Sequence, residues 1–116
     1  MGEIERVKLW EKNIYNAVLD ISDNSFQSEV WLGKNPNLVS SYEEVISVLF
    51  DDNDFVNYTE YYKNIHGEDR LYKLFFELIQ MINNYQNPGN DKLVLKDPNW
   101  IFITNKAKEV VRYFNK

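Results

Sequence analysis

EDRLYKLFFELIQMINNY, residues 68–85, is the stretch that decides the fold of this chain. Its apolar side chains recur at steps of three and four residues, the spacing that places them along one face of an α-helix. Glu68 and Asp69 precede that face and suit the positive end of a helix dipole. We therefore predict a central helix with an apolar face formed by Leu71, Leu74, Phe75, Leu78, Ile79, Ile82 and Tyr85.

The same periodicity predicts a long helix before this one and another after it. The first covers residues 3–21. The last begins at Asp97-Pro98, because proline at the first helical position loses no hydrogen bond and aspartate can cap the helix. The apolar face of the first contains Ile4, Val7, Trp10, Ile14, Ala17, Val18 and Ile21, and that of the last contains Ile101, Thr104, Ala107, Val110, Val111 and Phe114.

Two shorter helices are predicted between them. Ser41 and Glu44 form a Ser-x-x-Glu capping box, which marks the start of a helix that should end in the acidic turn 51–54. Asn53 or Asp54 should cap the next helix, residues 55–65, which His66-Gly67 should end.

The remaining segments are rich in turn-forming residues. SDNS at 22–25, the run 26–39 and NNYQNPGND at 83–91 are expected to be turns or irregular connections. Residues 29–32 and 92–95 could instead pair as a minor two-stranded β ribbon. The predicted fold class is all-α: about five helices around one core, in one domain spanning residues 1–116.

Composition limits the class of protein. Hydrophobic residues make up 44% of the 116 and aromatic residues 16%, enough for one compact core. The absence of cysteine excludes disulfides and thiolate chemistry. Charges near the N-terminus and the lack of a long apolar run predict no secretory signal and no membrane span, hence a cytoplasmic protein without a membrane partner.

Charge is concentrated in the middle of the chain. The net charge is −5, and residues 40–69 hold eight carboxylates against Lys63 alone, a local charge of −7. Nucleic-acid backbones are bound mainly through Lys and Arg, so we expect no nucleic-acid partner. An acidic segment attracts a basic partner instead.

No pattern of a catalytic or metal site is recognisable. A calcium loop counted from Asp52 would need Gly at its sixth position and Glu at its twelfth, where Asn57 and Lys63 stand. His66 is the only histidine and suits a helix C-terminus. There is no phosphate-binding glycine loop and no nucleophile motif. We therefore predict no enzyme activity, no metal and no cofactor.

Tyrosines and carboxylates cluster between residues 51 and 62. On a helix with a step of about 100° per residue, Tyr58 and Tyr62 share one face and Tyr61 points elsewhere. One interpretation places Tyr58 and Tyr62 at the core with their hydroxyls at its edge. The other makes Tyr61 an exposed binding anchor ringed by carboxylates.

The stretch SSYEEVISVLFDDNDFVNYTEYY, residues 40–62, resembles the small acidic immunity proteins that bacteria keep against their own nuclease or other polymorphic toxins. Those of the colicin type are helical domains that bind a basic toxin domain through carboxylates and adjacent tyrosines. The resemblance implies a stoichiometric toxin inhibitor. The acidic residues that speed its association with the toxin would be Asp51, Asp52, Asp54 and Glu60. The aromatic residues that slow its dissociation would be Tyr61 and Tyr58.

Two other hypotheses remain open. The chain could be an intracellular helical adaptor or regulatory subunit whose partner binds the 26–39 segment, with Trp31 and Leu32 as contacts. It could also be a small enzyme, which would need a pocket holding a carboxyl group with a raised pKa.

Overall fold

The computed structural model describes residues 2–33 and 40–114, and within them the chain forms seven α-helices, one π-helical segment and no strand. In chain order these are α1 (Glu3–Ser22), α2 (Asn24–Trp31), α3 (Tyr42–Ser47), the π segment η1 (Val48–Asp52), α4 (Phe55–His66), α5 (Arg70–Asn84), α6 (Asp91–Lys96) and α7 (Pro98–Phe114). The predicted all-α fold class is confirmed.

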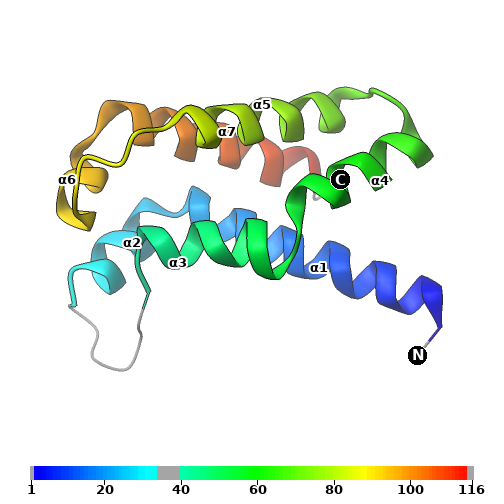
Figure 1. Ribbon diagram of the computed structural model, residues 1–116, viewed down its shortest axis with the longest axis horizontal. Helices are drawn as coiled ribbons and strands as arrows, with labels where there is room; N and C mark the ends of the chain where they lie inside the picture. Colours follow the sequence, from blue (N-terminus) through cyan, green and yellow to red (C-terminus); the bar gives the residue numbers. More distant parts are fainter. Residues whose placement is uncertain (1, 34–39, 115–116) are drawn as a thin grey trace.

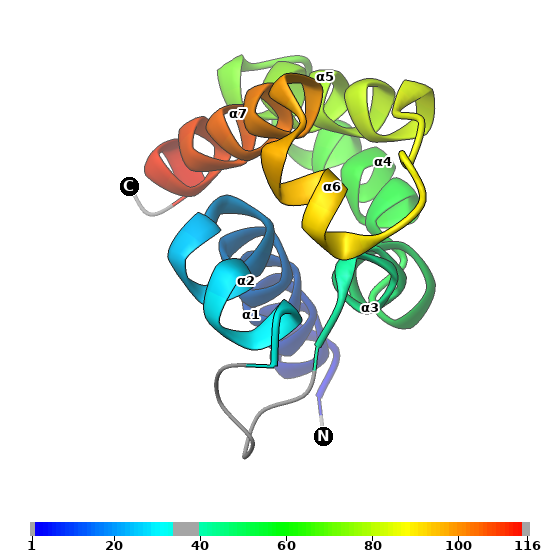
Figure 2. The ribbon, with the colours of Figure 1, turned by 90° about the vertical axis from the view of Figure 1, so that its left-hand side faces the viewer.

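The helices assemble around α7, which packs against α1 on one side and α5 on the other. Figure 1 shows α1 and α3 along one long side of the molecule and α5 with α7 along the other. The short helices α2 and α6 contact each other at one end, which Figure 2 views directly. α4 lies toward the opposite end and packs against α1 and α5.

The predicted central helix is confirmed as α5. Asp69 is its N-cap, because the carboxylate accepts the Tyr72 backbone N–H at 2.9 Å. Just before it, the predicted stop of α4 is also confirmed. Gly67 has a φ of 74° and a ψ of −166°, a conformation that only glycine adopts readily, and it donates its N–H to Lys63 O. The buried residues of α5 include Leu74, Phe75, Leu78 and Ile82.

Two helices stand where turns and a β ribbon were expected, so the predictions of five helices and of a ribbon are wrong. α2 occupies much of the segment predicted as irregular, and α6 covers residues 92–95. The cause lies in two turn formers that act as N-caps. Asp23 accepts the Phe26 N–H and Asn90 the Leu93 N–H, each at 2.9 Å, and each bond satisfies a free donor of a first helical turn. Residues 34–39 of the predicted connection lie outside the described residues.

The buried face of α7 differs from the predicted one. Ile101 is 41% exposed, whereas its neighbour Trp100 is completely buried. Ile103, Thr104, Ala107 and Val110 continue the buried face. Thr104, Ala107 and Val110 belong to the predicted face as well, so the difference lies in the first turns of α7, where Trp100 and Ile103 are buried in place of Ile101. Trp100 is buried because it packs against the rings of Trp31, Tyr42 and Tyr85, which no periodicity within α7 reports.

Rings surround Trp100 at one end of the core. Its indole lies 5.2 Å from the Tyr42 ring, 5.6 Å from Tyr85 and 6.0 Å from Trp31. The indole N–H donates to Gln27 Oε1 at 3.0 Å, and Gln27 Nε2 donates to the carbonyls of Asp20 and Ile21, both at 2.9 Å. This completely buried glutamine thereby joins α1, α2 and α7.

The second helix of the sequence prediction begins as expected and then changes pitch. Ser41 Oγ accepts the Glu44 N–H at 3.1 Å at the start of α3. The chain then widens into η1, and the Asn53 N–H reaches back five residues to Val48 O at 3.1 Å. α3 and η1 pack against α1, and η1 against α4.

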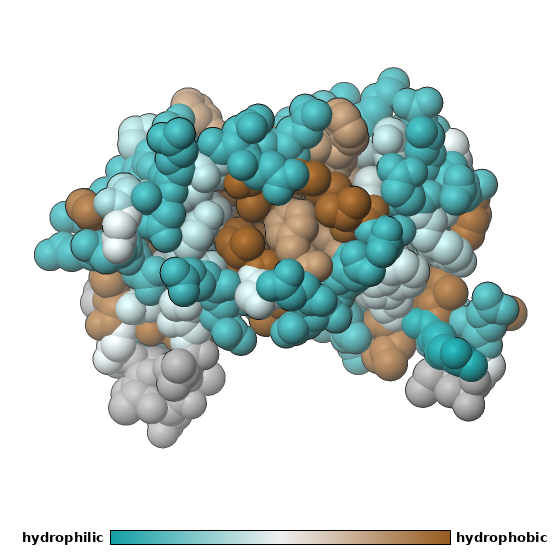
Figure 3. All heavy atoms as spheres, in the orientation of Figure 1, coloured by the Kyte–Doolittle hydropathy of each residue, from teal (hydrophilic) through white to brown (hydrophobic). Residues whose placement is uncertain are grey.

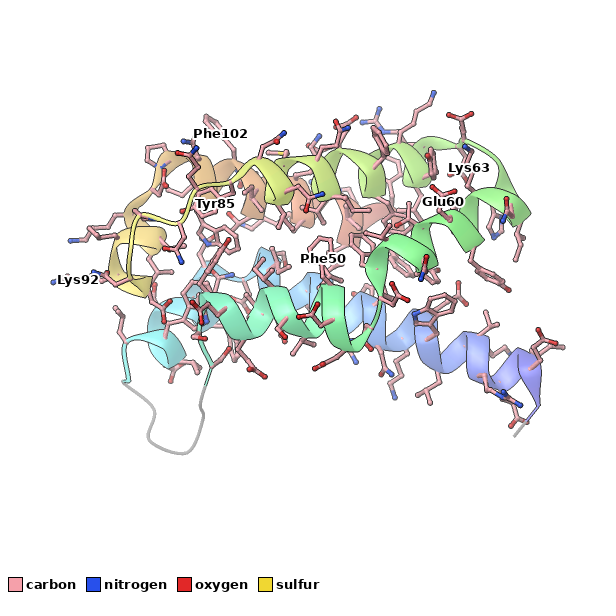
Figure 4. All side chains as sticks on the ribbon, viewed as in Figure 1. Phe50, Glu60, Lys63, Tyr85, Lys92 and Phe102 are labelled. Carbon is pink, nitrogen blue, oxygen red and sulfur yellow. The ribbon has the colours of Figure 1, made fainter. Side chains whose placement is uncertain are left out.

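An apolar hollow lies on the face between η1 and α5. Figure 3 shows hydrophobic side chains gathered in a depression that hydrophilic residues surround. Figure 4 places Phe50 there, projecting from η1 toward α5. Phe50 is half-buried and packs edge-on against the buried Phe55, with ring centroids 5.9 Å apart. The hollow is therefore an accessible extension of the core.

Candidate functional site

The acidic turn, residues 51–54, comprises the last two residues of η1 and the two residues before α4, and its carboxylates Asp51, Asp52 and Asp54 are all exposed. Local hydrogen bonds shape it. Asn53 Nδ2 donates to Val48 O at 2.7 Å, and Asp51 accepts from Ser47 Oγ at 3.2 Å. These bonds use the turn's polar groups internally, so its three carboxylates project into water.

The prediction that the side chain of Asn53 or Asp54 caps α4 is wrong. Asp54 occupies the N-cap position with a φ of 50°, in the left-handed region, and makes no cap bond to a backbone N–H. Its carboxylate instead accepts from Asn57 Nδ2 at 2.6 Å. Asn53 turns away from α4 to bind Val48.

Trp10 of α1 holds the acidic turn against the body of the protein. Its indole N–H donates to Asn53 O at 2.7 Å. The same ring lies 5.2 Å from Tyr58 and 5.7 Å from Tyr61 of α4. One tryptophan thus connects the turn, the long N-terminal helix and the two predicted anchors.

Burial separates the tyrosines. Tyr58 is only 1% exposed, and its hydroxyl donates to Glu11 Oε2 at 2.9 Å. Tyr62 is half-buried, and its hydroxyl donates to Asp69 Oδ2 at 2.7 Å. The interpretation that places both at the core with hydroxyls at its edge is confirmed, so the surface-anchor role predicted for Tyr58 is excluded by its burial.

Tyr61 is half-buried against Trp10 and remains accessible on one side. It lines a hollow with residues of α1: Glu3, Ile4, Val7, Lys8 and Glu11. The carboxylates that share this hollow with Tyr61 therefore come from α1, which the spacing within 51–62 could not indicate.

Glu60 lies apart from Tyr61 although the two are adjacent in sequence. It is exposed and shares its side of α4 with Lys63, as Figure 4 shows. Lys63 Nζ lies 5.6 Å from the centroid of the Tyr72 ring in α5, so this side of α4 faces α5. Glu60 thus contributes charge near the turn but does not line the hollow beside Tyr61.

The carboxylates of residues 40–69 form no ion pair with any described residue. Within residues 2–33 and 40–114 the ion pairs join Arg70 with Glu109 and Lys106 with Glu77 and Glu109, so none includes a carboxylate from residues 40–69. The described residues also hold no group of three or more His, Cys, Asp or Glu placed to bind a metal ion. None of the described helices combines the length and apolar character that a membrane span requires.

Asp20 has a raised pKa, first because of burial and second because of the nearby Asp23 charge. It lines a hollow of about 200 Å³ with residues that include Ser40 and Glu44. The Asp20 side chain is nevertheless exposed at the edge of that hollow. A carboxyl group in such contact with water differs from the desolvated acids on which general acid–base catalysis depends.

The tyrosine–carboxylate pairs of α4, Tyr58 with Glu11 and Tyr62 with Asp69, contain groups with shifted pKa values. Burial raises the pKa of Tyr58 above its ordinary value, and the hydrogen bond to Glu11 raises it further. Burial and the bond to Asp69 do the same for Tyr62. Burial alone would raise the pKa of Asp69, but the Tyr72 N–H and the Tyr62 hydroxyl hold it below its ordinary value. Both hydroxyls therefore stay protonated near neutral pH and remain hydrogen-bond donors.

Asp69→Asn is expected to make stability less sensitive to acid. A carboxyl group with a depressed folded pKa contributes stability above its unfolded pKa of about 3.9, and that stability is lost as the pH falls through the folded pKa. Asparagine is as good an N-cap residue as aspartate, but its side chain does not titrate. Urea unfolding between about pH 6 and about pH 2 should show a smaller loss for the variant than for the natural protein. Equal losses of stability in the variant and in the natural protein would contradict this role of Asp69.

Comparison of the chain with known protein families, curated proteins and solved structures found no match.

Proposed function

We propose that this protein is a stoichiometric protein-binding inhibitor of the immunity type, which neutralises a basic bacterial toxin. Binding would use an acidic–aromatic surface, defined as Asp51, Asp52, Asp54, Glu60 and Tyr61. The proposal includes no catalysis by this chain and no cofactor, since occlusion of a toxin needs neither.

The observation that carries the proposal is the set of three exposed carboxylates at the acidic turn, none in an ion pair with a described residue. Uncompensated charge of one sign attracts a partner of the opposite sign and accelerates encounter. The Trp10 indole holds this turn close to Tyr61, so the charges and an aromatic side chain are presented together on one rigid support.

Tyr61 is the residue suited to slow dissociation. Its ring is already ordered against Trp10, so little side-chain entropy is lost when a partner covers its accessible side. Tyrosine is also common among the residues that dominate binding energy. Tyr58 would act beneath the surface, by supporting Trp10 and Tyr61.

We define the turn variant as the protein in which Asp51, Asp52 and Asp54 are all changed to Asn. It should associate with the captured partner about tenfold or more slowly at low salt, because steering by charge can raise association rates by 10 to 10³. The salt dependence of the rate should flatten. A matched control changes Glu5, Glu29 and Glu43 to Gln, which removes three exposed negative charges outside the turn. Stopped-flow mixing measures both rates.

The partner would first be captured by a tagged form of the protein from the native cytoplasm at low salt, eluted with a salt gradient and identified by mass spectrometry. We expect to recover one basic partner with the natural protein. The control triple variant should capture the same partner, and the turn variant should not. An association rate that the turn variant leaves unchanged at low salt would refute the steering role.

The apolar hollow at Phe50 favours the second candidate, a helical adaptor or regulatory subunit. An accessible apolar depression is typical of a surface where a partner segment docks. Trp31 cannot serve as the predicted partner contact, because it is only 8% exposed. Leu32, the other predicted contact, is exposed. Capture of a partner that elutes independently of salt and is retained by the turn variant would support the adaptor over the inhibitor.

A further inference from the structure

Glu11 lies where two hollows meet. The hollow beside Tyr61 has a volume of about 340 Å³, and a second of about 420 Å³ opens on the other side of Glu11. The second hollow lies among α1, α4, the start of α5 and the end of α7. It is lined by Glu11, Tyr58, Tyr62, Asp69, Arg70, Leu71, Tyr113 and Phe114.

The lining of the second hollow combines anions with aromatic rings. Glu11 is half-buried and forms no ion pair with any described residue. The Tyr58 hydroxyl binds one of its oxygens, Oε2, and so fixes the carboxylate in place. A carboxylate accepts up to about four hydrogen bonds, so Glu11 retains capacity for another donor. Carboxylates beside aromatic faces attract organic cations.

Arg70 shows what kind of cation this wall accommodates. Its guanidinium carbon lies 5.4 Å from the centroid of the Tyr113 ring, at the edge of the same hollow. Its Nη2 lies 3.8 Å from Glu109 Oε2, which directs the group toward α7. Both of these partners of Arg70, Tyr113 and Glu109, are on α7, whereas the Glu11 carboxylate pairs with no described cation.

We propose that this hollow receives an arginine side chain of a basic protein partner, whose guanidinium would bind Glu11 and lie against the tyrosine rings. Arginine suits the site better than lysine, because its planar group stacks on rings and offers two parallel donors to a carboxylate. Glu11 also borders the hollow that contains Tyr61, so an arginine could enter while its parent protein covers the acidic–aromatic surface. This inference rests on the proposed function for the identity of the partner.

A peptide titration tests the pocket without the toxin. Acetyl-Gly-Arg-Gly-amide is added to the isotopically labelled full chain, and two-dimensional NMR follows the shifts. Versions with lysine and with citrulline, the neutral counterpart of arginine, serve as comparisons. We expect saturable binding in the order arginine, lysine, citrulline, with the largest shifts at the rings of Tyr62 and Tyr113.

Glu11→Gln should weaken arginine-peptide binding about tenfold or more and reduce the preference over citrulline, since the charge-assisted bond is lost. The matched control Glu5→Gln removes a charge from the same helix outside both hollows and should bind like the natural protein. Tyr58→Phe keeps the buried ring but removes the hydroxyl that orients Glu11, so a smaller loss is expected. Circular dichroism confirms that each variant is folded.

Absence of saturable binding, equal binding of the citrulline peptide, or an unchanged affinity of Glu11→Gln would overturn the inference. These results are separable from those on the proposed function. If the arginine peptide binds but no basic partner is captured, the arginine pocket is supported and the proposed inhibitor function is refuted. If a basic partner is captured and Glu11→Gln does not alter its affinity, the inhibitor function is supported and the arginine pocket is refuted.

Discussion

Trp100→Ala is expected to lower the free energy of unfolding by about 3–5 kcal/mol, the cost typical of removing a fully buried aromatic side chain. Trp100 has no exposed surface and packs among Trp31, Tyr42 and Tyr85. Its removal also leaves Gln27 Oε1 without the indole donor in a buried environment, an additional penalty. Urea unfolding monitored by far-ultraviolet circular dichroism measures the change.

Ile101→Ala is the matched control for Trp100. Ile101 is the next residue of α7 and is 41% exposed, so its truncation should cost much less than that of Trp100. The pair distinguishes the face of α7 found in the structure from the face predicted by periodicity alone. A loss at Ile101 that equals or exceeds the loss at Trp100 would show that α7 is rotated relative to the arrangement described above.

Phe75→Ala is expected to cost a similar amount, about 3–5 kcal/mol, at the other end of the core. Phe75 is completely buried. Its ring lies 5.4 Å from those of Phe55 and Tyr62, 5.5 Å from Phe114 and 5.9 Å from Tyr58. Because Tyr58 and Tyr62 line the hollow next to Glu11, the variant should also weaken arginine-peptide binding under conditions where it remains folded.

Phe76→Ala provides the comparison for Phe75. Phe76 is the adjacent residue but is 46% exposed, so its truncation should change stability by only about 0.5 kcal/mol. It should leave peptide binding unchanged, because it lines neither hollow. Comparable losses at the two phenylalanines would contradict the orientation of α5.

The three longest helices were predictable because their apolar periodicity is long, whereas α3 and α4 were predictable from their start and stop signals. α1, α5 and α7 each present repeated apolar side chains over several turns, and burial of such a face stabilises a helix wherever it packs. α2 and α6 have eight and six residues, too few for a period to be distinctive. Their start signals, Asp23 and Asn90, were present in the sequence, but aspartate and asparagine mark turns as often as helix starts.

The candidate site was predictable in part for a similar reason. Asp51, Asp52 and Asp54 are adjacent in a turn, and charged residues in turns face water. The helical step separated Tyr61 from Tyr58, and Tyr58 is the more buried of the two. It also separated Tyr61 from Tyr62, but both of these are half-buried, because Trp10 of α1 covers one side of Tyr61. Glu11 was missed, although a signal existed. It lies four residues after Val7 and three before Ile14, so it places a charge within the apolar stripe of the first helix.

By itself, the sequence determined an all-α chain, the positions of its long helices and the acidic character of its middle segment. These depend on local periodicity and on charges that remain in water. Only the tertiary structure decided which face of α7 is buried, that Gln27 bonds to Trp100 73 residues away, and that Glu11 meets Tyr58 of α4. Such contacts join side chains far apart in the chain, and their free energy depends on shape and burial that no local pattern encodes.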